Sequence, residues 1–130
     1  MSLLAAFRSL VLSHPEVTDE IGDRLHAEFV PEQSERPNAY FTVISSAPVM
    51  RVDGKPTLYR YRIQIGCRGR TAMEAEGVSY TIRKAIEHGS GGGITKVLHL
   101  GRLPGSWDPQ LRTYAADDDY AVWWTQDQGE

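Results

Sequence analysis

The residues from Leu58 to Cys67 alternate between apolar and polar side chains, and this pattern constrains the fold more than any other feature of the sequence. A period of two is typical of a strand with one buried face, since successive side chains of a strand point to opposite sides of the sheet. A sheet with one buried face needs a covering layer, so we expect helices packed against it. The apolar face carries Tyr59, Tyr61, Ile63, Ile65 and Cys67, and the other face carries Arg60, Arg62 and Gln64.

Two amphipathic segments can supply the covering layer. Residues 2–12 and 71–89 both place apolar side chains at helical spacing. Thr71 and Glu74 have the spacing of a capping box, which indicates the start of the second helix. We interpret Gly77, inside that helix, as a point of close packing against the sheet.

The remaining segments complete the predicted order of elements, α-β-β-β-α-β-β. Residues 18–22 indicate a helical turn, and the proline-bearing stretch 103–119 is interpreted as an exposed loop or an irregular hairpin. The order predicts one α+β domain over residues 1–130, with a mostly antiparallel sheet of about four to five strands and two helices on one face. Residues 126–130 are expected to form a flexible tail. Besides the alternating strand, strands are predicted at 24–30, 39–45, 94–100 and 120–125.

Composition limits the kinds of partner. A net charge of −3 over 130 residues does not favour a nucleic acid or a membrane surface as the partner. No stretch approaches the roughly 20 apolar residues that a membrane span requires. The amino terminus lacks the pattern of a signal peptide. A single cysteine, Cys67, leaves no disulfide within the chain and fits a reducing compartment.

No group of residues in the sequence indicates catalysis or a cofactor. The four histidines are widely spaced, and the glycines at 89–93 follow a helix rather than opening one, unlike a phosphate-binding loop. Cys67 lies on an apolar strand face, where cysteine is usually an inert small hydrophobe. The run Asp117 to Asp119 is interpreted as a solvated acidic loop. We therefore expect a protein that is not an enzyme and that binds no metal or cofactor.

Charge is distributed unevenly along the chain. Residues 51–70 carry a local charge of about +5, and residues 108–130 carry about −5. The ordinary interpretation is a mixed surface. The sharper hypothesis is that the basic strand face of one subunit meets the acidic loop of the next, as in head-to-tail contacts that close into rings. Together with two tryptophans, the candidate interface residues are Arg51, Asp53, Lys55, Arg60, Arg62, Asp108, Asp117, Asp118, Asp119, Trp123 and Trp124.

Trp123 and Trp124 are candidate interface residues because they are adjacent in a predicted strand. They point to opposite faces of the sheet, so both faces need cover. The helices can cover one face. The other face needs a loop of this chain or another subunit, and the sequence leaves these two alternatives open.

A series of short motifs, in this order, resembles the tail-completion (tail-terminator) family of long-tailed bacteriophages, prophages and gene-transfer particles. The resemblance extends over nearly the whole chain. After an N-terminal helix, the motifs are Ile21-Gly22-Asp23-Arg24, Ala39-Tyr40-Phe41-Thr42-Val43, Asp53-Gly54, the alternating basic strand, Thr71-Ala72-Met73-Glu74-Ala75, and Tyr114 with Asp118 before a closing aromatic strand.

The resemblance implies a structural virion protein without catalytic residues. Such proteins form a hexameric ring that caps the tail tube, halts its growth and presents the joint to the head. It further implies tail tube protein on one ring face, a head-completion or neck protein on the other, and assembly in the host cytoplasm. The loops at 46–56 and 104–119 are the candidates for recognition, since long loops on a rigid sheet usually carry it.

Two alternatives remain open. The first is a head-completion or neck connector, which would bind the portal rather than the tube. The second is a small DNA-binding module that uses the stripe Arg60, Arg62, Arg68 and Arg70. That module would need aromatic side chains on the same face for base stacking, and Tyr59 and Tyr61 point to the opposite face.

Overall fold

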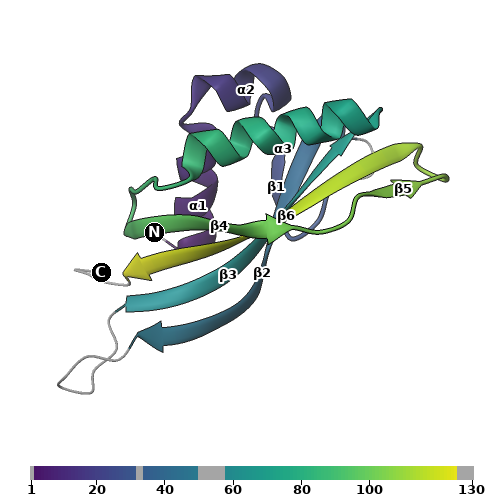
Figure 1. Cartoon of the computed structure of the whole chain (residues 1–130). Coiled ribbons are helices and arrows are strands. Elements are labelled where there is room, and N and C mark those ends of the chain that lie inside the picture. The colour runs from purple at the N-terminus through teal and green to yellow at the C-terminus, as the bar shows by residue number, and fades with distance from the viewer. Residues whose placement is uncertain (1, 32–33, 50–57, 126–130) are drawn as a thin grey trace.

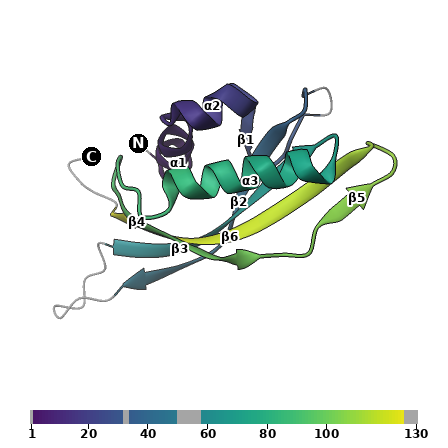
Figure 2. The same cartoon turned by 45° about the horizontal axis from the view of Figure 1, so that its top comes forward.

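The computed structural model describes residues 2–31, 34–49 and 58–125. Three helices lie on one side of a single twisted sheet (Figures 1 and 2). The helices are α1 (Leu3–Leu12), α2 (Pro15–Ile21) and α3 (Ala72–Ile86). The strands are β1 (Leu25–Ala27), β2 (Asn38–Val49), β3 (Leu58–Gly69), β4 (Ile94–Arg102), β5 (Ser106–Asp108) and β6 (Thr113–Thr125).

The sheet has the strand order β1-β2-β3-β6-β4, and β5 also pairs with β6. Only β1 and β2 run parallel, while the pairs β2–β3, β3–β6, β4–β6 and β5–β6 are antiparallel. The predicted α+β class with a mostly antiparallel sheet is therefore confirmed. The chain has more elements than expected, with six strands and three helices in its described part.

The extra helix is α2, for which the sequence pattern predicted only a turn. Pro15 occupies the first turn of this helix, where its missing N–H is not needed, so α2 begins three residues before the turn expected at 18–22. Gly22 ends α2 with a φ of 61°, as the pattern indicated. Leu25, three residues further on, begins β1 and is fully buried.

The start of α3 follows the prediction in part. The Thr71 hydroxyl accepts a hydrogen bond from the Glu74 N–H at 3.1 Å. The Glu74 carboxylate does not return the bond to Thr71 but accepts from the Arg70 N–H at 2.8 Å. The helix ends at Ile86, earlier than Gly89, and His88 follows it with a φ of 68°. Gly77 is not a site of close packing, since a Cβ there would meet nothing within 4 Å.

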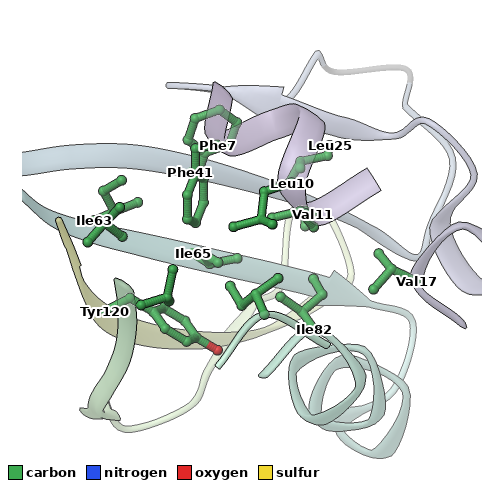
Figure 3. Close-up of a cluster of buried hydrophobic side chains, with 14 of the residues drawn as sticks. Phe7, Leu10, Val11, Val17, Leu25, Phe41, Ile63, Ile65, Ile82 and Tyr120 are labelled. Atoms are coloured by element: carbon green, nitrogen blue, oxygen red, sulfur yellow. The ribbon is translucent and has the colours of Figure 1, made fainter. Parts of the chain in front are cut away.

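One hydrophobic core lies between the helices and the sheet (Figure 3). The rings of Phe7 from α1 and Phe41 from β2 meet with centroids 5.3 Å apart. Ile63 and Ile65 from β3 lie on the same face, which confirms the apolar side of the alternating strand. Burial of this stripe against the helices orients the other face of the sheet away from the core, and that face carries Arg60 and Arg62 of β3 and Asp117 and Asp119 of β6.

Of the two alternatives for residues 103–119, an exposed loop or an irregular hairpin, the structure has the hairpin. β5 and the first half of β6 lie in this stretch and pair antiparallel. β6 is thirteen residues long and forms the central strand between β3 and β4. The predicted tail at 126–130 lies outside the described residues.

Candidate functional site

The candidate interface residues that the structure describes lie on three strands, β3, β5 and β6. Arg60 and Arg62 lie on β3 and face away from the helices, next to β6. Asp108 lies in β5, where its carboxylate accepts from the N–H groups of Gln110 and Leu111 at 2.9 and 3.2 Å and stabilises the following turn. Three further candidates, Arg51, Asp53 and Lys55, lie outside the described residues. The remaining candidates, Asp117, Asp118, Asp119, Trp123 and Trp124, all belong to β6.

The acidic run is not a solvated loop. Asp118 and Asp119 are buried, with 2% and 6% of their surface exposed. They can be buried because β6 pairs with β3, which brings Arg62 within 2.5 Å of the Asp119 carboxylate. The basic strand face and the acidic run therefore meet within one chain, whereas the sequence hypothesis placed that contact between subunits.

Asp117 lies on the same helix-free face as Asp119, beside Gly66 of β3. Burial raises the pKa of the Asp117 carboxyl above its usual value, and the nearby Arg68 guanidinium opposes this shift in part. A Cβ on Gly66 would lie 2.3 Å from the Tyr40 ring and 2.8 Å from the Asp117 carboxylate. Gly66 thus leaves room for an aromatic ring to lie across the sheet.

Asp118 points to the helix side of the sheet and joins three elements. Its carboxylate accepts from the Ser79 hydroxyl of α3 and lies 2.8 Å from Nε2 of His99 on β4. Nε of Arg102 donates to the same carboxylate at 3.4 Å, and Nη2 of Arg102 donates to Ser79 at 2.6 Å. Sequence reasoning missed Ser79, His99 and Arg102, because no local spacing connects residues on three separate elements.

This cluster has the residue types of a serine hydrolase but not the arrangement. In a catalytic triad the histidine lies between the hydroxyl and the carboxylate, so that it can take the hydroxyl proton. Here the Asp118 carboxylate lies between Ser79 and His99, and Ser79 is itself buried. The arrangement fastens α3 to the sheet. Within the described residues, no group of three or more His, Cys, Asp or Glu side chains is placed to hold a metal.

The two tryptophans lie on opposite faces, as predicted. Trp124 is buried on the helix side, and its indole N–H donates to the Gly92 carbonyl at 3.2 Å. Gly93, with a φ of 92°, packs so closely that a Cβ there would lie 2.7 Å from the Trp124 indole nitrogen. The glycine-rich link, residues 89–93, therefore packs closely against Trp124 and covers its ring. On the other face, Lys96 of β4 lies over the ring of Trp123 at 5.1 Å.

The helix-free face also changes the argument about nucleic acid. Trp123 is the register partner of Arg60, so an aromatic ring does share the face with the basic stripe. Tyr40 lies on this face too, with the Arg68 guanidinium 5.4 Å from its ring centroid. Arg68 and Lys96 thus lie against these two rings. Asp117 and Asp119 of β6 lie between the rings on the same face.

A cavity of about 610 Å³ opens between α3 and the end of β4, beside Asp118. The helix side of its lining consists of Met73, Glu76, Gly77, Tyr80 and Arg83, and His99 and Arg102 line it from the strand. Met73 and Tyr80 are largely exposed, at 84% and 58%. We call this surface the α3–β4 groove. None of the helices in the described part of the chain is long and apolar enough to cross a membrane.

Comparison with known proteins identifies a shared fold. No protein-family model matches the sequence, and no curated protein sequence matches it either. Among solved structures, the chain is similar to a chain of the "Virion of native gene transfer agent (GTA) particle", with a TM-score of 0.65. The match covers 95% of this chain and 98% of that chain at 10% sequence identity. At that identity the similarity establishes the α+β fold over nearly the full length of both chains.

Proposed function

We propose that the protein is a structural component of a phage-like virion and, within it, the tail terminator. The observation that carries the proposal is the fold shared with a chain of a gene transfer agent virion, over 95% of this chain and 98% of that one. Since the two chains are of matching extent, the similarity concerns a whole subunit rather than a common submotif. The order of sequence motifs points independently to the tail-completion family.

In this function the protein acts through surfaces and performs no reaction. A ring of identical subunits, six in the tail-completion family that the sequence resembles, would close over the last ring of the tail tube and prevent further addition. The opposite ring face would receive a neck protein of the filled head. The protein would then reside at the head-proximal end of the tail, after assembly in the host cytoplasm.

A head-completion or neck connector is the second candidate, because the fold comparison does not distinguish components of one virion. Deleting the gene in cells that produce the particle, with negative-stain imaging of the products, separates the two functions. Overlong tails without heads are expected for a terminator, because nothing then stops tube growth. Tails of normal length that are detached from heads would instead assign the neck role. Particles of normal form would contradict both, and restoring the gene should restore normal particles.

DNA binding by the helix-free face is a third function, favoured by the shared position of Trp123 and Arg60. Phosphate contacts make affinity fall steeply with salt. Titrating labelled single-stranded DNA with the protein at low and moderate salt tests this function. We expect no salt-dependent binding, because Asp117 and Asp119 lie between the basic side chains. Binding that weakens with salt and is lost in Trp123→Ala would establish the DNA-binding function.

A further inference from the structure

The second half of β2 is exposed on both of its faces. From Ile44 to Val49 every residue is exposed, and we call this stretch the β2 edge segment. On one side it pairs with β3; on its other side, β1 reaches only as far as Phe41. The segment extends away from the helices in Figures 1 and 2. It therefore contributes little to the core of its own chain.

β2 also lacks the usual protection of an edge strand. Edge strands commonly carry charged side chains, which discourage pairing with other chains. No residue from Asn38 to Val49 is charged. A bulge between Val43 and Ser45 and the proline at 48 hinder pairing with another strand along only part of the edge. The exposed apolar side chains of Ile44 and Val49 remain uncovered within the described structure.

The opposite edge of the sheet, formed by β4 and β5, exposes apolar side chains too. Leu100, Leu103 and Trp107 are all exposed there. Next to them lies the α3–β4 groove, with the exposed side chains of Met73 and Tyr80 on its helix wall. The β2 edge segment thus lies toward one end of the strand order β1-β2-β3-β6-β4, and this groove, whose lining also carries Glu76, Arg83 and Arg102, lies at the other end.

We propose that the β2 edge segment of one copy packs into the α3–β4 groove and along β4 of a second copy. This contact rests on the proposed function, whose ring requires two different surfaces at opposite sides of each subunit. Strand direction agrees, because β2 and β4 run in opposite directions within one sheet. Two copies side by side in the same orientation therefore present antiparallel strands to one another. The occupant is another copy because this chain displays both edges, β2 and β4, with opposite strand directions.

Cysteine cross-linking tests the contact directly. Ala47 is exposed in the β2 edge segment, and Gly77 lies in the groove, where a Cβ would meet nothing within 4 Å. The native Cys67 is buried and should not react. The variant Ala47→Cys/Gly77→Cys, treated with a short bismaleimide, should give a ladder of covalent oligomers, both free in solution and in assembled particles. A mixture of the two single variants should stop at a dimer, and each single variant alone should stay uncross-linked.

Several outcomes would overturn the contact. One is a double variant that does not cross-link either in solution or in particles. Another is a single variant that cross-links to itself, since that requires a two-fold contact. The gene-deletion experiment decides the function separately: overlong tails together with absent cross-links would retain the terminator and reject this contact.

A second measurement covers the case in which an introduced cysteine disturbs the segment. Ile44→Asp should reduce self-association at least tenfold, measured by sedimentation, with an unchanged circular dichroism spectrum. Leu111→Asp, at a side chain of similar exposure in the turn between β5 and β6, should leave association unchanged. If Ile44→Asp instead abolishes binding to tube protein and leaves self-association intact, the occupant is the tube and the proposal is wrong.

Discussion

Arg62 on β3 and Asp119 on β6 form an ion pair on the helix-free face of the sheet, with Nη2 of Arg62 2.5 Å from Oδ2 of Asp119. The arginine side chain is about half exposed, at 51%, whereas the carboxylate is 9% exposed. The pair is therefore asymmetric, because losing the arginine leaves a carboxylate that water reaches poorly.

Removing Arg62 should destabilise the fold through Asp119. We expect Arg62→Ala to lower the free energy of unfolding by about 1–2 kcal/mol, the cost of leaving a buried acceptor without its donor. Asp119→Ala in the same background should recover part of this loss. Urea unfolding of both single variants and the double variant gives the coupling energy. Arg60→Ala, at an exposed neighbour on the same face, is the control and should change stability little.

The pH dependence of stability should report Asp117. The pKa of Asp117 is raised in the folded state, so its carboxyl ionises less readily there than in the unfolded chain. The ionised carboxylate therefore lowers the free energy of unfolding at a pH where it is charged in both states. Asp117→Asn should therefore be more stable than the wild type at pH 7. The difference should shrink as pH falls through the folded pKa and vanish below the unfolded value of about 3.9. Urea unfolding of both proteins across this pH range measures the stability difference. A difference that does not change with pH would contradict a raised pKa of Asp117.

The contacts of Asp118 should be among the most costly to remove. Asp118→Ala takes away the acceptor shared by Ser79, His99 and Arg102, and leaves two of these side chains largely buried without it. Breaking such a buried charged cluster costs about 3–5 kcal/mol. Thermal and urea unfolding provide the measurement. Asp19→Ala, at an exposed position of α2, should change stability by less than about 0.5 kcal/mol.

The glycine-rich link offers a matched pair of substitutions. Gly93 and Gly91 both have positive φ values, 92° and 143°, but only Gly93 lies against Trp124. Gly93→Ala should therefore lower the free energy of unfolding more than Gly91→Ala does, by at least about 1 kcal/mol, because the Trp124 ring or the link must move. Trp124 fluorescence should shift only in the Gly93 variant. Equal losses of stability in the two variants would show that backbone strain alone explains both effects.

Local patterns predicted those parts of the fold whose cause is local. The alternation in β3 and the Thr71 cap of α3 each depend on a few consecutive residues, and both were predicted. α2 was predicted only as a turn over residues 18–22, because the pattern did not reveal that Pro15 begins the helix. The prediction for Gly77 failed because its neighbourhood depends on how α3 lies over the sheet, and Gly77 lines the α3–β4 groove.

The acidic run shows why the site was harder to predict than the fold. Three consecutive aspartates resemble a solvated loop unless their partners are known. The partners of Asp118 and Asp119 come from α3, β4 and β3, up to 57 residues away in sequence. Arg62 and Asp119 were both singled out from charge alone, yet the pattern could not tell a contact within one chain from a contact between two.

If the protein assembles as proposed, the pairing of Arg62 with Asp119 has a consequence for how the assembly behaves in different media. Charges neutralised inside one chain take no part in attraction between subunits, and the β2 edge segment carries no charge. A joint built on that segment would depend less on Coulomb forces, which dissolved ions screen within about 8–10 Å, than a joint between two charged faces. In the proposed assembly, its strength would then vary less between dilute and saline surroundings.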